Sequence, residues 1–174
     1  MKFNSKWKKK SFILIPPILI LIALMFLIPN KEALVFHDSE QVLAYIPLSE
    51  GNTFKIKYTH SIHLSDVIES YEILKDLSIR QYELQYEDFA VGMPADASAG
   101  ETFEVIEGKY YIKNMNRVFS FFDLRVGQVR ANHTVLYKNK EYPLSSYIEP
   151  GTRVRVIVKK INLLQRMEGV NILE

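Results

Sequence analysis

The chain has 174 residues, a net charge of +2 and no cysteine. Five lysines lie within residues 1–10, which contain no acidic residue, so the rest of the chain carries a net charge of about −3. This charge balance argues against a nucleic-acid-binding protein. The absence of cysteine excludes disulfide bonds and attachment of a lipid through an N-terminal cysteine.

The first predicted element is a membrane anchor. Residues 11–28, SFILIPPILILIALMFLI, contain no charged side chain. A helix of this length extends roughly 27 Å, close to the ~30 Å hydrocarbon thickness of a bilayer. The lysines before this segment, against Lys31 alone just after it, place the N-terminus in the cytoplasm. We therefore expect a basic cytoplasmic tail at 1–10, a transmembrane signal anchor at 11–29 and an extracytoplasmic domain at 30–174.

A cleavable signal peptide is the alternative interpretation of this segment. Such a peptide has a shorter apolar stretch, usually about 7–15 residues, that ends in small residues. Here the stretch ends in Met25-Phe26-Leu27-Ile28-Pro29-Asn30, which lacks small residues at the paired positions. The sequence therefore favours an uncleaved anchor. Pro16-Pro17 removes two backbone donors, so we expect a kink there or a helix confined to Ile18 onward.

Beyond the anchor, apolar and polar residues alternate with a period of two, which is typical of antiparallel strands with one buried face. In one such run Phe54, Ile56 and Tyr58 alternate with lysines, and in another Tyr82, Leu84 and Tyr86 alternate with polar residues. The predicted strands cover residues 34–37, 41–47, 54–58, 67–73, 82–86, 103–107, 110–113, 119–126, 134–137 and 154–158.

Turn signals separate these strands, among them Glu107-Gly108-Lys109 and Lys138-Asn139-Lys140. A short helix is expected at 162–167, and the small residues and proline of 89–100 predict a surface loop. So many short strands in one domain predict an all-β fold, an antiparallel β-sandwich or a partly closed barrel, preceded by one N-terminal transmembrane helix.

The four histidines, His37, His60, His63 and His133, are candidates for metal ligation. His60 and His63 are three residues apart, which points them to opposite faces of a strand unless a turn brings them together. The sequence contains no H-E-x-x-H motif and no dense cluster of histidine and aspartate. We therefore expect no metal site and no bound cofactor.

Nucleophilic catalysis requires a serine or threonine beside an oriented base. Ser61 is the candidate nucleophile, with His133 or a carboxylate from another strand as its base. The chain has no G-x-S-x-G motif, and no strand-to-helix context for one. No catalytic residue is therefore assigned, and a small exported hydrolase is kept as an alternative.

Several of these residues occur in a familiar order. The order begins with Tyr58-Thr59-His60-Ser61 and Glu69, continues with Gly92-Met93-Pro94 and His133, and ends with Pro143-Leu144 before Glu149-Pro150-Gly151. It resembles the bacterial domain of unknown function 1850, over about residues 34–159. Two departures are Asp66, where the family tends to have proline, and Ala90, where it has a second glycine.

The resemblance implies a small exported or anchored β domain found beside, or fused to, permeases of TAXI-type tripartite ATP-independent (TRAP) transporters. The expected partners are thus the cytoplasmic membrane and a TRAP permease or its solute-binding protein. The resemblance also implies that one region with a binding or loop-organising role contains His60, Ser61, Glu69, Gly92, Pro94 and His133. A hydrogen bond from His60 to Glu69 that locks the loop, a solitary ligand-binding domain and a purely structural envelope protein are the alternatives.

Overall fold

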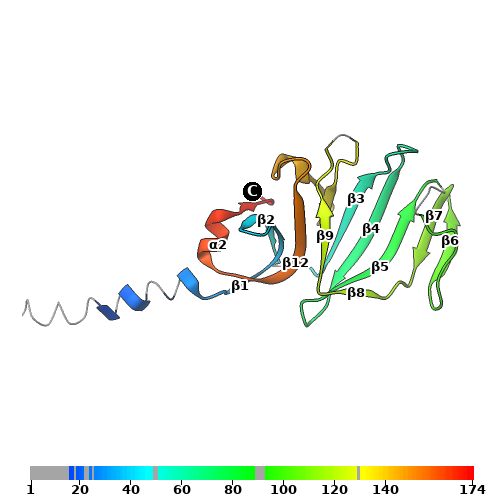
Figure 1. The fold of residues 1–174 in the computed structure, drawn as a ribbon. Helices are drawn as coiled ribbons and strands as arrows, with labels where there is room; N and C mark the ends of the chain where they lie inside the picture. Colours follow the sequence, from blue (N-terminus) through cyan, green and yellow to red (C-terminus); the bar gives the residue numbers. More distant parts are fainter. Residues whose placement is uncertain are drawn as a thin grey trace, which may run out of the picture.

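The computed structural model describes residues 16–17, 19–21, 24, 26–48, 51–88, 93–128 and 130–174. Within this part the chain forms an all-β domain with two short helical segments near its C-terminus (Figure 1). The elements, in chain order, are β1 (Lys31–His37), β2 (Val42–Pro47), β3 (Thr53–Thr59), β4 (Asp66–Ile73), β5 (Ile79–Tyr86), β6 (Thr102–Ile106), β7 (Lys109–Lys113), β8 (Arg117–Phe119), β9 (Phe121–Arg125), β10 (Thr134–Tyr137), β11 (Lys140–Pro143), the 3₁₀ helix η1 (Leu144–Ser146), β12 (Arg153–Ile161), α2 (Leu163–Glu168) and β13 (Val170–Asn171).

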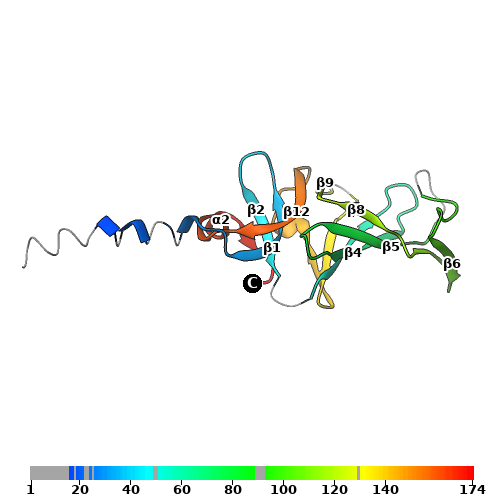
Figure 2. The same ribbon diagram turned by 90° about the horizontal axis from the view of Figure 1, so that it is seen from below.

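The strands form two sheets, as expected for a sandwich rather than for one closed barrel. The small sheet has the order β13-β2-β1-β12-β9, and the large sheet has the order β11-β10-β3-β4-β5-β7-β6, with β8 also paired to β5. Neighbouring strands are antiparallel except for β13 and β2, which are parallel. Figures 1 and 2 show that β7 and β6 of the large sheet extend beyond the small sheet.

The core lies between the facing surfaces of the two sheets. Alternate side chains of β3 and β12 are buried there, which confirms the period-two interpretation of those strands. On the small sheet Phe36 and Val156 are fully buried, and on the large sheet Phe54 and Ile56 face them from β3. This packing of apolar side chains holds the sheets together without a disulfide.

In β5 of the large sheet, buried and less buried side chains do not alternate regularly. The register between β4 and β5 shifts at Ser70 and Tyr71, so Gln81 pairs with Tyr71 and Glu83 pairs with Ser70. The extra residue, Tyr82, is only half-buried, whereas Gln81 is 6% exposed. The expectation that Tyr82 shares the buried face of Leu84 and Tyr86 is therefore wrong, because a β-bulge moves Gln81 to that face.

The predicted strand 119–126 is two strands in different sheets. β8 pairs with β5 in the large sheet, and β9 pairs with β12 in the small sheet. The chain passes from one sheet to the other at Ser120, which separates these two strands. This crossing puts aromatic side chains of β8 and β9 beside one another, with the Phe119 and Phe122 ring centroids 6.5 Å apart.

Two predicted turns are tight hairpins. Both central residues of each turn have positive φ, 51° and 79° at Glu107 and Gly108, and 50° and 60° at Lys138 and Asn139. This is the geometry of a type I′ turn, whose twist matches the flanking strands. The predicted helix is α2, and its N-cap residue Asn162 forms a capping box with Gln165.

About half of the segment expected to form the anchor lies outside the described residues. Its described positions between 16 and 27 are helical, but no helix in the described part of the chain is both long and apolar enough to cross a bilayer. The end of this segment is held to the domain. Asn162 Nδ2 donates to the carbonyl oxygen of Leu27 at 3.2 Å, and the amide of Asn30 donates to that of Ile161 at 3.2 Å.

Candidate functional site

A polar pocket of about 350 Å³ lies where the edge of the small sheet meets the large sheet. It is lined from β3, β4, β5, β8 and β9, and by His133 just before β10. Polar and aromatic groups supply most of this lining. They are Tyr58, Glu69, Tyr71, Gln81, Phe119, Phe122, Asp123 and His133.

Glu69 is the central carboxylate of the pocket. It lies on β4 opposite Ile56 of β3 and Leu84 of β5, so its neighbours across the sheet are apolar. Its carboxylate accepts a hydrogen bond of 2.7 Å from the Tyr71 hydroxyl. Burial raises the pKa of Glu69, and the Tyr71 hydroxyl and the more distant Arg117 oppose this shift.

Tyr71 is fixed in place by aromatic packing. Its ring stacks on Phe54 of β3 and on Phe122 of β9, with both centroid distances 5.1 Å. Burial raises the pKa of Tyr71, and so does the neighbouring Glu69 carboxylate. The hydroxyl therefore stays protonated and donates a hydrogen bond to Glu69. The stack therefore holds the hydrogen-bond donor against the carboxylate from both sheets.

His133 forms another side of the pocket. Its ring lies 5.4 Å from that of Tyr58, whose pKa is raised chiefly by burial and secondly by Glu69. Burial lowers the pKa of His133 and so favours the neutral ring, and its buried Nδ1 has no hydrogen-bond partner among the described residues. A Cβ on Gly127 would lie 2.7 Å from the amide nitrogen of Asn132, so glycine allows the backbone to approach closely just before His133.

His60 and Ser61 lie outside this pocket, in the turn after β3. The turn is closed by hydrogen bonds from the His60 amide to Ser65 (2.8 Å) and from the Leu64 amide to His60 (2.9 Å). Ser61 is exposed there. The expected bond from His60 to Glu69 is wrong, because Glu69 accepts from Tyr71 and His60 Nδ1 accepts weakly from the Ile62 amide at 3.4 Å.

The turn also affects the histidines considered as metal ligands. It brings the rings of His60 and His63 to a centroid distance of 5.9 Å, which a continued strand would have prevented. Among the described residues, however, no group of three or more histidine, cysteine, aspartate or glutamate side chains is placed to hold a metal ion. The histidine pair therefore lacks the further protein ligands of a usual metal centre.

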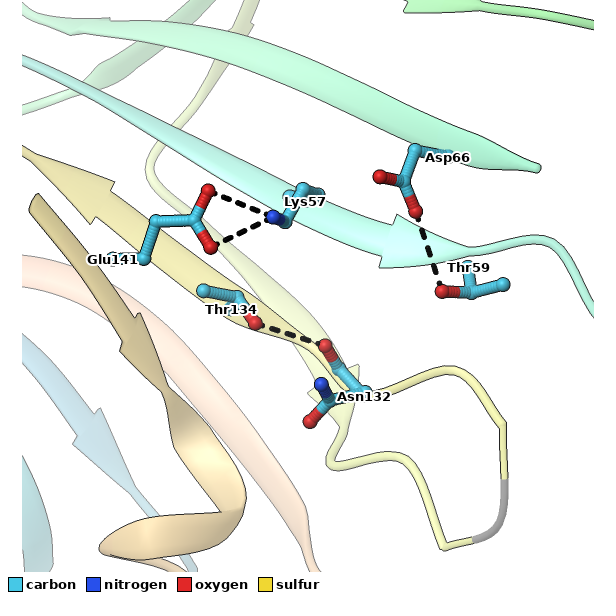
Figure 3. Close-up of polar contacts among 6 residues, drawn as sticks. All are labelled: Lys57, Thr59, Asp66, Asn132, Thr134 and Glu141. Carbon is cyan, nitrogen blue, oxygen red and sulfur yellow. Dashed lines mark hydrogen bonds and ion pairs between the residues drawn. The ribbon is translucent and has the colours of Figure 1, made fainter. Parts of the chain in front are cut away.

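The turn and the segment before His133 lie at the same end of the large sheet. The amide of Thr59 donates to the carbonyl of Ala131 at 2.9 Å. Figure 3 shows the surrounding contacts, in which Thr59 donates to Asp66 (3.4 Å) and Thr134 to the Asn132 carbonyl (3.0 Å). Of the residues expected in one region, Glu69 and His133 line one pocket, and His60 and Ser61 lie in an exposed turn at the same end of the sheet.

The glycine-proline loop falls in a different place. Gly92 lies outside the described residues. The carbonyl of Pro94 accepts a hydrogen bond from the Tyr86 hydroxyl, and Met93 packs on a second apolar cluster that includes Tyr86 and Ile112. Pro94 therefore belongs to the part of the large sheet around β5 and β7, and it does not line the pocket of Glu69.

A family model for a domain of unknown function (DUF1850) matches residues 54–144. The chain belongs to this family. No curated protein and no solved structure matches the chain. The DUF1850 match begins in β3 and ends in η1, so it contains every residue that lines the pocket, while β1, β2 and β12 of the small sheet lie outside it.

Among the polar pocket residues of the DUF1850 region, sequence reasoning did not assign Tyr58, Tyr71, Gln81 and Asp123 to the site. A signal for Tyr71 was present in the sequence, because Glu69 and Tyr71 share the inward face of a strand whose other inward residues are Val67 and Ile73. A buried carboxylate needs a hydrogen-bond donor, and Tyr71 is the residue with a hydroxyl next to Glu69 on that face. Gln81 could not be placed in this way, since the bulge reverses the face on which it lies.

The DUF1850 pocket offers both hydrogen-bond acceptors and groups that can donate. Its polar groups are the Glu69 and Asp123 carboxylates, the Gln81 amide, the Tyr58 and Tyr71 hydroxyls and the His133 ring. Its lining contains no serine, threonine or lysine, and Ser61 makes no hydrogen bond to His133 in the described part of the chain. Among the described residues, the pairing of Ser61 with His133 that the hydrolase alternative requires is therefore not formed.

Proposed function

We propose that the protein is a membrane-tethered extracytoplasmic module that works beside a TAXI-type TRAP uptake permease. The observation that carries this proposal is the charge-free segment 11–28, preceded by five lysines and leading directly into the β domain. Membership of the DUF1850 family supports it further, through the transporter context that the resemblance implies.

The junction between this segment and the domain supports a tether of short reach. The hydrogen bonds that Leu27 and Asn30 make with Asn162 and Ile161 leave few residues between the apolar segment and the folded domain. Leu164 and Met167 of the adjoining α2 are 40% and 71% exposed. A domain held this close to a bilayer has a raised effective concentration near any permease in the same membrane.

The experiment is site-specific crosslinking in native membranes. Because the chain has no cysteine, a single Ser61→Cys substitution provides a unique attachment point for a photoactivatable maleimide. Ser61 is exposed at the pocket end of the large sheet, and the control Lys140→Cys is exposed at the other end of β10. The tagged full-length protein is purified after illumination, and the crosslinked products are identified by mass spectrometry.

We expect a TRAP permease or its solute-binding protein among the products from Ser61→Cys and its absence from those of Lys140→Cys. Loss of uptake in a His60→Ala/Ser61→Ala variant with an unchanged fold would agree with this result. Recovery of no transporter component from Ser61→Cys, together with unchanged uptake in the double variant, would contradict the proposal.

A further inference from the structure

We propose that the inter-sheet pocket around Glu69 and His133 binds a small organic ammonium ion. The proposal concerns the domain itself and goes beyond its role beside a transporter. It depends on three properties of the pocket, which are a carboxylate without an ion pair among the described residues, free acceptor positions on that carboxylate and an aromatic wall.

The first property is charge. Among the described residues Glu69 forms no ion pair, whereas the second carboxylate of the pocket, Asp123, is bound by Arg153 (2.8 Å) and Arg155 (3.0 Å). Arg117, the cation that acts on Glu69 from a distance, pairs with Glu101 at 3.4 Å. A desolvated carboxylate without a cation is costly, so a cationic ligand would be bound favourably and an anionic one would be repelled.

The second property is hydrogen bonding. The Tyr71 hydroxyl occupies one acceptor position of the Glu69 carboxylate and leaves others free. Among the described residues His133 Nδ1 is buried and has no hydrogen-bond partner. The free acceptor positions of Glu69 call for a ligand that donates. A primary ammonium carries three N–H donors on one atom, so it can fill more than one of these positions.

The third property is the apolar surface around these acceptors. The rings of Tyr58, Phe119 and Phe122 line the pocket together with Ile56 and Leu124. Aromatic rings attract cations, and most strongly where water is partly excluded. At about 350 Å³ the pocket lies at the small end of the range for ligand sites. An ammonium group with a short apolar chain fits this combination, and a sugar or a polyanion does not.

The test is titration of the purified full-length protein, in detergent micelles and an amine-free buffer, with n-butylammonium chloride. Isothermal calorimetry measures the binding, and n-butanol and sodium butyrate serve as probes of equal chain length without the positive charge. We expect saturable binding of butylammonium, much weaker binding of butanol and none of butyrate. Equal binding of butanol, binding of butyrate, or no saturable binding of butylammonium would overturn the proposal.

Two variants show whether binding occurs in this pocket. Glu69→Gln keeps an acceptor for Tyr71 but removes the charge, so we expect affinity for butylammonium to fall at least tenfold. Glu141→Gln is the matched control, because Glu141 is exposed and pairs with Lys57 at 2.8 Å away from the pocket (Figure 3). An equal loss in both variants would contradict the assignment.

Tyr71→Phe provides a second measure should Glu69→Gln fold poorly. It leaves the charge of Glu69 in place while removing its protein donor. Binding of butylammonium should persist in this variant, because the charge of Glu69 is retained, and its loss would overturn the proposal. Because no transporter is present in these titrations, their outcome is independent of the crosslinking result.

Discussion

Glu69 occupies a position of β4 that its neighbours mark as inward, with Val67 and Tyr71 on either side of it on the same face. A carboxylate at such a position opposes folding unless a donor accompanies it. Tyr71 provides that donor, and the two stacked rings of Phe54 and Phe122 keep the hydroxyl in place. We interpret this costly residue as one kept for binding, since an apolar side chain would pack there at lower cost.

The cost of Glu69 predicts a pH-dependent gain in stability from Glu69→Gln. The folded-state pKa of Glu69 is raised from 4.5, so the protonated form favours folding at low pH and this benefit is lost as pH rises through the raised pKa. The variant has no carboxyl group to ionise. Its free energy of unfolding relative to the wild type should therefore increase across that interval and level off above it.

Urea denaturation followed by circular dichroism, at intervals between about pH 3.5 and 8, measures this difference. His133 is present in both proteins, so its own titration cancels to first order. Glu141→Gln, at an exposed position, should show no such pH dependence. A constant difference between Glu69→Gln and the wild type across this range would show that Glu69 does not titrate with a raised pKa.

At the scale of elements, the strands with clear alternation were predictable and the irregular ones were not. Runs such as β3 and β12 place every second side chain in the core, so the period alone identifies them. The division of 119–126 between two sheets and the bulge at Tyr82 depend on which strands become neighbours. The strand β11, Lys140–Pro143, was missed because it is short and largely polar.

The residues of the candidate site were likewise predictable only in part. Glu69 and His133 were identified from the order of residues that the family shares, but the meeting of Tyr58 with His133 requires the pairing of β3 with β10. His60 and Ser61 follow Tyr58 closely in the sequence and still leave the pocket, because the chain turns at His60. Sequence order predicted that these residues belong to one region and could not predict which of them face inward.

The cap of α2 yields a prediction at this scale, because one side chain has two separable roles. Asn162 Oδ1 accepts from the Gln165 amide at 2.9 Å, and Nδ2 donates to Leu27 at 3.2 Å. Asn162→Ala removes both bonds and should cost about 1 kcal/mol of stability. Asn162→Asp keeps the cap but has no donor for Leu27, so the stability of α2 should remain near that of the wild type.

Thermal melting gives the stability of both Asn162 variants. Hydrogen exchange at residues 26–30 reports separately on the junction, and it should increase in Asn162→Asp as well as in Asn162→Ala. If Asn162→Asp destabilised the domain as much as Asn162→Ala, the cap would not be the main role of this side chain.

The elements of the molecule are arranged in sequence from the apolar N-terminal segment to the far edge of the large sheet. Figure 1 shows the described helical residues and α2 at one end, and β7 and β6 at the other. The small sheet, which joins the N-terminal segment through β1, lies between them. In a tethered protein this order would keep β1, β12 and α2 near the bilayer and extend the pocket and the long sheet away from it.

The central claim is that the apolar segment anchors the domain outside the cytoplasm, and cysteine labelling in intact cells tests it most directly. The chain has no cysteine, so Ser61→Cys in the exposed turn and Ser5→Cys in the basic tail each carry a single thiol. With a membrane-impermeant maleimide, we expect Ser61→Cys to react in intact cells or spheroplasts and Ser5→Cys to react only after the membrane is permeabilised. Labelling of Ser61→Cys only after permeabilisation, or release of the protein from washed membranes, would contradict the claim.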